Sequence, residues 1–396
     1  MSGLAACGGS SPTPTAPTTT TPPAAVPPVP TGAAPVTQIP GCAGAGTTLF
    51  DALPVALADF LAFRPLGFLS PPIHMFPAKH SAFGMSMPGT VAPKVPIRAP
   101  GRVWVKEIWE ATFSTGGANY QVYVYPCNDV RVYFGHLATL SEKLLTEMQK
   151  VPASCNSFAD GTALVTTCRH LDMAVPLESN EAMGTGPDTA GVDFGLVDFR
   201  RSPAAFIRLE HYDHFYPYWA SPLDYFTADV RTQLAARTGS VFGSPLRTAS
   251  PIGGSHAQDV AGTAQGNWFP PGVYHANTTD LGPMLGLASD YVDPSQPIMA
   301  IGSSIRGMAM GLYSFSVESQ GLTNRAFRAV TADGNTYCFD RFRSGQSVGG
   351  LPLRQPAGVL LMSMPGDSTL RVELAPGSSC ASASRAFTVG ASTFER

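Results

Sequence analysis

Alternation of hydrophobic and polar residues dominates this chain, and helical spacing is rare. Val, Tyr and Phe alternate with polar residues over short runs that end near Gly, Pro, Asn or Asp. A period of two is typical of strands with one buried face. Strands are predicted at residues 102–113, 119–126, 129–137, 162–168, 192–199, 298–304, 311–317, 326–331, 335–342, 358–364 and 370–375. The predicted fold class is therefore mainly β.

Three segments are predicted to be helical. Residues 53–63 form an apolar stretch of helical length. The pattern at residues 139–142 (TLSE) fits a capping box and predicts a helix that runs to about Lys150. A further helix is expected to open at Pro222, a residue favoured at the first helical position, and to end before Gly239.

Length and a change in composition divide the chain. A total of 396 residues suffices for about two domains of roughly 150–200 residues each. Residues 238–252 are rich in Gly, Ser and Pro, which indicates a boundary. We expect one β domain at residues 41–240 and a second one, a β-sandwich or barrel, at residues 253–396.

The N-terminal residues carry a signature of export. Residues 4–7 (LAAC) match the bacterial lipobox, in which a small residue precedes a lipidated cysteine, here Cys7. Residues 1–7 are therefore interpreted as the remnant of a lipoprotein signal, although a four-residue match also arises by chance. Residues 8–40 consist mainly of Pro, Thr, Ala and Val, and this composition predicts a disordered tether that forms no core.

Charge and motif content exclude several functions. Only 13% of the residues are charged, the net charge is −3, and the sequence contains no basic run. Nucleic-acid binding is therefore not expected. The sequence has no run of about 18 apolar residues that would predict a transmembrane helix. It also lacks the GxSxG, GxGxxG and GxxxxGK[ST] motifs.

The cysteines that follow Cys7 are even in number, which in an exported protein indicates disulfides. Two of them flank a short turn and are expected to clasp a hairpin, two lie near the C-terminus, and the remaining two pair by elimination. This is one of the 15 connectivities that six cysteines allow. The expected pairs are Cys155 with Cys168, Cys338 with Cys380, and Cys42 with Cys127.

Four short segments follow one another in the order of a known family. They are residues 96–103 (PIRAPGRV), 133–137 (YFGHL), 181–186 (EAMGTG) and 191–194 (GVDF). Together they resemble the lysostaphin/LytM-type zinc endopeptidases, which act on peptidoglycan and have the duplicated hybrid motif, an all-β scaffold. The resemblance covers about residues 65–230 and implies a peptidase-like β domain there.

The ligand positions of that family are largely changed in this chain. A catalytic zinc site needs three protein ligands and an open position for water. The resemblance places a first ligand at His80 and another at Asp193, a carboxylate where the family has His. Gly84 stands at the remaining ligand position, and Gly191 stands where the general base belongs. The set is incomplete unless His74 supplies a third ligand.

His136 matches the active-site His of the family that does not bind the metal. Each candidate also has a simpler interpretation: His136 as a hydrogen-bonded framework residue, Asp193 as a partner of backbone amides, and His74 as a loop residue. No cofactor is expected; if the protein does bind a cofactor, zinc is the candidate.

A second cluster of polar residues lies at residues 210–214 (EHYDH) and is followed by aromatic residues. His and carboxylate side chains at this density can bind metal, and the aromatic rings can form a platform for carbohydrate or peptide. The alternative is a surface loop. The candidate binding residues are His211, Asp213, His214, Tyr218 and Trp219.

These observations together predict a lipoprotein of the bacterial cell envelope, periplasmic or surface-exposed, that is tethered to the membrane through Cys7. Its peptidase-like domain is expected to have lost catalysis and to bind or scaffold, with peptidoglycan or an envelope protein as the partner. The alternative is a metal-dependent peptidoglycan hydrolase with altered ligands.

Overall fold

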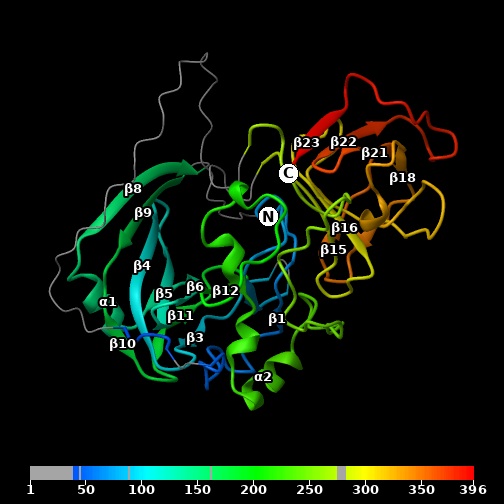
Figure 1. Cartoon of the computed structure of the whole chain (residues 1–396). Helices are drawn as coiled ribbons and strands as arrows, with labels where there is room; N and C mark the ends of the chain where they lie inside the picture. Colours follow the sequence, from blue (N-terminus) through cyan, green and yellow to red (C-terminus); the bar gives the residue numbers. More distant parts are fainter. Residues whose placement is uncertain (1–38, 44–45, 88–89, 161–162, 274–281) are drawn as a thin grey trace.

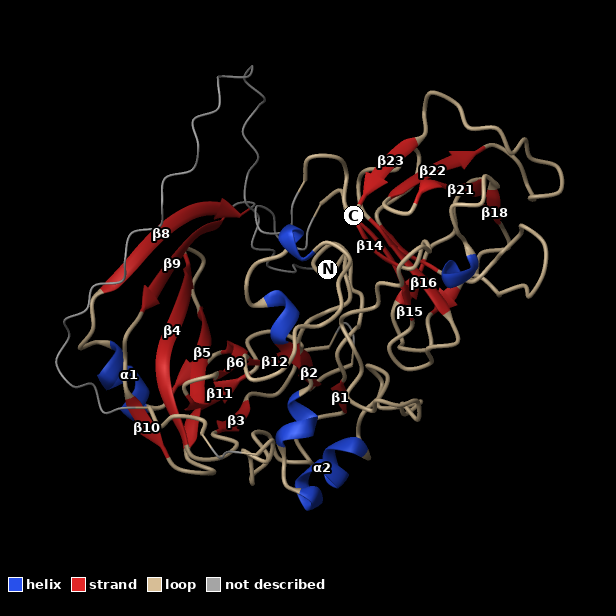
Figure 2. Cartoon of the chain, viewed as in Figure 1, coloured by secondary structure: helices blue, strands red, loops and turns tan. Residues whose placement is uncertain are grey.

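The computed structural model describes residues 39–43, 46–87, 90–160, 163–273 and 282–396. The expected lipid attachment site at Cys7 and most of the expected tether lie outside these residues. The fold is mainly β, as predicted, and strands make up most of the regular structure (Figure 2). No helix of the described part is long and apolar enough to cross a membrane.

A ten-stranded antiparallel sheet forms the centre of the N-terminal half. The strand order is β1-β2-β12-β6-β5-β4-β9-β8, while β10 pairs with β4 and β13 pairs with β12. Its strands are β1 (Ala62–Arg64), β2 (Ser81–Gly84), β4 (Val103–Phe113), β5 (Ala118–Cys127), β6 (Val130–Leu137), β8 (Ala153–Asp160), β9 (Ala163–His170), β10 (Val175–Leu177), β12 (Gly191–Asp198) and β13 (Trp219–Ala220).

One face of this sheet is buried against a smaller sheet and a helix. The small sheet has the order β3-β11-β7, with β3 (Val95–Arg98), β7 (Thr139–Leu140) and β11 (Ala182–Gly186). Helix α1 (Glu142–Met148) follows β7 along the chain. Alternate residues of β6 and β12, among them Phe134 and Phe194, point into this core. The residues between them point to the opposite face, because side chains alternate along a strand.

The C-terminal half is a β-sandwich. Apolar side chains of a six-stranded and a four-stranded sheet pack together in one core. The first sheet contains β14 (Gly266–Trp268), β15 (Leu285–Ser289), β16 (Pro297–Ile301), β17 (Gly311–Tyr313), β19 (Gly345–Gln346) and β20 (Pro352–Leu353). The second contains β18 (Tyr337–Phe339), β21 (Val359–Gly366), β22 (Thr369–Ala375) and β23 (Ser392–Glu395).

The two halves share a packed apolar layer. Leu287 and Met299 of β15 and β16 face the inside of the sandwich. Their strand neighbours Ala288 and Ile298 face the other way and pack with Phe76 and aromatic residues of the N-terminal half. A sheet with two apolar faces needs cover on both, so the N-terminal half supplies part of the cover of this sheet. Figure 1 shows the two halves side by side.

The helix predictions have mixed outcomes. The apolar stretch at residues 53–63 is not a helix: it forms turns and leads into β1. Helix α1 is present, but its N-cap is Ser141, whose hydroxyl accepts from the amide of Leu144. The helix expected from Pro222 is broken into a 3₁₀ turn (Pro222–Tyr225) and helix α2 (Ala228–Ala235).

The strand predicted at residues 326–331 is also wrong, because this segment forms the 3₁₀ turn Phe327–Ala329. Phe327 and Val330 are buried there, and a spacing of three matches a 3₁₀ turn rather than a strand. The other predicted strands overlap with observed ones.

All three expected disulfides are present, Cys42–Cys127, Cys155–Cys168 and Cys338–Cys380. Disulfides persist in oxidising environments. Three of them in one chain indicate an extracellular or periplasmic location.

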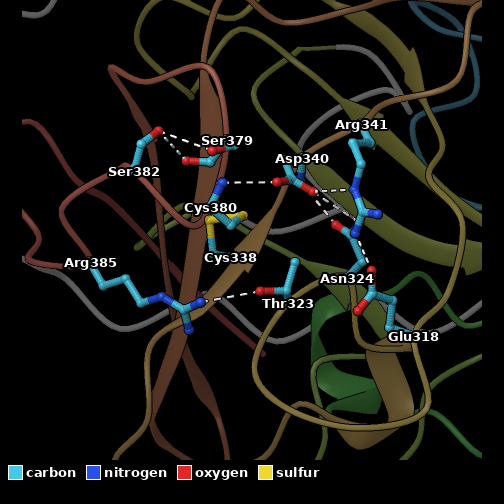
Figure 3. Close-up of polar contacts among 10 residues, drawn as sticks. All are labelled: Glu318, Thr323, Asn324, Cys338, Asp340, Arg341, Ser379, Cys380, Ser382 and Arg385. Atoms are coloured by element: carbon cyan, nitrogen blue, oxygen red, sulfur yellow. Dashed lines mark hydrogen bonds and ion pairs between the residues drawn. A yellow bond between two sulfur atoms is a disulfide. The ribbon is translucent and has the colours of Figure 1, made fainter.

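A polar network adjoins the disulfide of the C-terminal half (Figure 3). Asp340 accepts hydrogen bonds from the amide of Cys380 at 2.8 Å and from the side chains of Asn324 and Arg341 at 3.1 Å each. Burial opposes the charge of Asp340, but these donors hold its pKa below the ordinary value. The carboxylate is thereby satisfied and links two loops to the sandwich.

Candidate functional site

The pairing of β2 with β12 brings His80 and Asp193 together. Ala82 lies opposite Asp193 in this register, and His80 precedes β2 on the same face. Because Phe83 and Val192 point into the core, His80 and Asp193 point to the opposite face of the sheet. The His80 Nδ1 and Asp193 Oδ1 atoms are 3.6 Å apart, and the two side chains are 4% and 18% exposed.

His136 completes the cluster from the end of β6. Its Nε2 lies 3.3 Å from Asp193 Oδ2, and its Nδ1 lies 3.0 Å from the amide nitrogen of Asn119. The backbone of His136 has φ of 65°, which is uncommon for a residue other than Gly and is found more often at functional sites. This conformation turns the ring toward Asp193.

Asn119 ties the cluster to a further carboxylate, since its amide also donates to Asp188 at 3.3 Å. A neutral His136 donates from Nε2 to Asp193 and accepts at Nδ1 from Asn119. A protonated His136 carries a hydrogen on both nitrogens, so Asn119 must then turn its amide oxygen toward the ring. The amide of Asn119 is therefore coupled to the charge of His136.

Aromatic rings surround His80. The rings of His74, Phe68 and Tyr133 have their centres 5.0, 5.4 and 5.8 Å from that of His80. Burial lowers the pKa of His80 to about 4, and the neighbouring carboxylate of Asp193 offsets only part of this effect. His80 is therefore neutral at physiological pH.

Asp193 and His136 form the charged part of the cluster. Burial opposes ionisation of Asp193, but His80 and His136 hold its pKa well below the usual range. Burial also opposes protonation of His136, and Asp193 outweighs it, so the pKa of His136 is raised. Protonation of His136, with Asn119 turned to present its amide oxygen, gives an ion pair with Asp193 next to a neutral His80.

The cluster does not fit a zinc site as it is placed. In the described residues, no group of three His, Cys, Asp or Glu side chains stands in an arrangement that holds a metal ion. Gly84 and Gly191, where the resemblance requires a ligand and a base, lie opposite each other in the β2–β12 pair. A Cβ on Gly191 would lie 2.4 Å from the carbonyl oxygen of Phe83, so no side chain fits there without a backbone shift.

A row of aromatic rings leads away from the cluster across the same face. The centres of Trp109 and Tyr123 are 5.1 Å apart, those of Tyr123 and Tyr133 5.8 Å, and those of Tyr133 and Trp219 5.7 Å. We call these four residues the aromatic row. It needs Gly195 beneath it, since a Cβ there would lie 2.2 Å from the Tyr133 ring and 2.6 Å from the Trp219 ring.

Two arginines accompany the aromatic row. The guanidinium of Arg169 lies 4.2 Å from the ring centre of Trp109, and that of Arg131 lies 4.1 Å from Tyr123. Stacked guanidinium groups hold rings in place through cation–π attraction. Tyr123 is buried, whereas the rings of Trp109, Tyr133 and Trp219 are partly exposed, and exposed aromatic surface suits sugar or peptide ligands.

The second predicted cluster does not converge. His211 is buried and packs against Phe269 of the C-terminal half, with ring centres 4.8 Å apart. Asp213 accepts from the amides of Phe215 and Tyr216 at 2.9 Å each, so it stabilises a turn. The ring of His214 lies against that of Phe215. The segment therefore joins the two halves and makes no common site.

The two aromatic candidates separate as well. Trp219 belongs to the aromatic row, while the ring centre of Tyr218 lies 5.2 Å from that of Phe199. Sequence reasoning missed Asn119 and three members of the row, Trp109, Tyr123 and Tyr133, because alternation assigns a residue to a face and does not identify its neighbours on other strands. Gly195, inside an otherwise β-forming run, was the available signal for close packing over the strand.

Comparison with protein families, with curated proteins and with solved structures finds no match to this chain.

Proposed function

We propose that this protein is a cell-envelope lipoprotein whose peptidase-like domain binds peptidoglycan, or scaffolds at the cell wall, without cleaving it. One observation carries the proposal. His80, Asp193 and His136 meet on the face of the sheet opposite the core, at the positions where the resemblance to LytM-type peptidases puts the site, while Gly84 and Gly191 leave that site without its second ligand and its base.

Electrostatics support a binding role. Both carboxylate oxygens of Asp193 face histidine nitrogens, so the charge that a metal would neutralise is already balanced inside the protein. Tyr133, an inner member of the aromatic row, lies next to His80, with ring centres 5.8 Å apart. A ligand lying along the row would stack on the partly exposed rings of Tyr133 and Trp219 and pass beside the polar cluster.

A hydrolase with altered ligands is the second candidate. It is favoured by His74, whose ring centre lies 5.0 Å from that of His80, because these two could combine with Asp193 and His136 around zinc after a rearrangement. Zinc analysis of the purified chain separates the candidates. Stoichiometric zinc that is lost in His80→Ala, together with cleavage of peptidoglycan, would support the hydrolase and contradict the binder.

Binding is tested by co-sedimentation of the full chain with purified cell-wall sacculi. Trp219→Ala removes one end of the aromatic row, and we expect at least about a tenfold loss of affinity, as for a buried aromatic contact in an interface. Trp104→Ala is the matched control, because Trp104 lies on the same sheet outside the row. Equal binding by the two variants would show that the aromatic row is not part of the binding site.

The lipid anchor is a separate part of the proposal. A sequence match at residues 4–7 supports it, and the oxidising location that the disulfides indicate is compatible with it. In cells that express the full-length precursor, Cys7→Ser should move the protein from the membrane fraction to the soluble fraction. Continued membrane association of the variant would contradict the anchor.

A further inference from the structure

Strand β8 forms an open edge of the ten-stranded sheet. It pairs with β9 on one side, and among the described residues no strand pairs with its other side. Residues 153–157 are all exposed. Figure 1 shows β8 as the outermost strand of the N-terminal half, far from the C-terminal sandwich.

The register fixes which backbone groups point outward. In antiparallel pairs, directly opposed residues alternate between a hydrogen-bonded pair with Cα atoms about 5.5 Å apart and a non-bonded pair about 4.5 Å apart. Cys155 and Cys168 are directly opposed, with Cα atoms 4.0 Å apart, so they form a non-bonded pair. The N–H and C=O of Cys155 therefore point away from β9. The same holds for every second residue, namely Ala153, Ser157 and Ala159.

This edge lacks the usual protection against pairing. Natural edge strands carry Pro, Lys or a bulge, or are short. β8 has eight residues with the sequence ASCNSFAD, no Pro and no basic residue, and it is in regular register with β9 along its length. The Cys155–Cys168 disulfide fixes the hairpin, so little further chain order is lost when a strand is added.

We propose that β8 pairs with β8 of a second copy of this chain, in antiparallel orientation about a twofold axis, so that the two sheets become continuous. A register centred on Asn156 places Cys155 opposite Ser157 of the other copy and Ala153 opposite Ala159. It uses all outward groups and forms about eight hydrogen bonds, two for each bonded pair. The twofold axis brings the two Asn156 amides together, where they can bond each other.

Charge favours a second copy as the occupant. The outward-facing positions of β8 are uncharged, so two copies meet without repulsion. The single charge of the strand, Asp160, lies at its C-terminal end, while Lys150 precedes its N-terminal end. In the antiparallel dimer each Asp160 approaches the Lys150 end of the other copy, and opposite charges meet at both ends. A Lys ammonium has three donors, so Lys150 can keep its ion pair with Glu147.

Sedimentation velocity of the full chain over a range of concentrations tests the dimer. Ser157→Pro removes one outward N–H from each copy and leaves the pairing with β9 intact, because Ser157 is in a non-bonded pair and Pro is tolerated there. We expect dimers for the native chain and for the matched control Ser157→Ala, and at least about tenfold weaker association for Ser157→Pro. Ser157→Lys, which keeps the N–H and adds like charges near the axis, should also weaken the dimer.

Amide hydrogen exchange of the native chain gives a second readout that needs no variant. The amides of Ala153, Cys155, Ser157 and Ala159 should exchange rapidly at low concentration and become protected as dimer forms. A native chain that stays monomeric at about 100 μM would overturn the proposal. So would a dimer whose protection lies elsewhere, or one that a folded Ser157→Pro variant leaves unchanged.

Discussion

The ion pair of Asp193 with His136 is expected to stabilise the N-terminal domain in a pH-dependent way. The perturbation is Asp193→Asn, which keeps the shape and one hydrogen-bond acceptor but removes the charge. At 3.3 Å, two unit charges attract by about 5 kcal/mol at an effective dielectric constant near 20. His136 is 34% exposed, so solvent screening and the cost of burial reduce the net loss to about 1–2 kcal/mol.

The sign of the pH dependence follows from the pKa shifts. Asp193 raises the pKa of His136 above 6.5, so the stabilisation is fully present below pH 6.5 and is lost as the pH rises through the raised pKa. His80 adds an effect of the same sign. Its pKa is lowered to about 4 by burial and partly restored by Asp193, so the variant loses further stability on acidification.

The assay combines thermal unfolding with an NMR titration of the histidine ring protons. At pH 6, Asp193→Asn should lower the midpoint of the N-terminal domain by roughly 2–8 °C, at about 2–4 °C per kcal/mol, and by clearly less at pH 9. The pKa of His136 should lie above 6.5 in the native chain and below it in the variant, where burial is unopposed. Equal destabilisation at the two pH values, or a native pKa below 6.5, would refute the reasoning.

Three further substitutions have expected outcomes. Arg396→Ala should destabilise the C-terminal domain by about 3 kcal/mol in thermal unfolding. The reason is that the buried guanidinium donates to three backbone carbonyls and stacks on Trp268 at 4.2 Å. A loss of stability below about 1 kcal/mol would contradict this prediction. Gly195→Ala should weaken co-sedimentation with sacculi by displacing the Tyr133 ring, and unchanged binding would show that the row does not bind the wall. The Gly84→Asp variant should bind zinc, as measured by metal analysis of the purified protein. A new Cβ would have its nearest atom 3.6 Å away, and the carboxylate would lie on the same face of the sheet as His80 and Asp193. A variant that binds no zinc would show that more than one ligand is missing.

Local patterns in the sequence predicted the strands because alternation reports directly on which face is buried. The secondary-structure predictions were wrong at two segments where buried apolar residues do not belong to the predicted helix or strand. Residues 53–63 form a series of turns that place Val55 and Phe60 in the core of the first domain. The apolar side chains of this segment are therefore buried as expected, but the backbone is not helical. At residues 326–331 the buried positions are three apart, which alternation does not describe.

The candidate site was only partly predictable, because its parts meet through long-range strand pairing. His80 and Asp193 come together only through the register of β2 with β12, and the resemblance to a family with the same segment order supplied that information. Asn119 and the aromatic row depend on neighbours across β4, β5 and β6. The residues of the cluster at 210–214 are adjacent in sequence but point to different partners, which proximity along the chain does not reveal.

The central claim is that the site binds the cell wall without cleaving it. The most direct test is to incubate the full chain and one equivalent of zinc with purified sacculi, and to quantify protein in the pellet and newly formed amino groups in the supernatant. The account predicts protein in the pellet and amino groups at the level of a protein-free control. Release of amino groups above that level, or protein that stays in the supernatant, would contradict it.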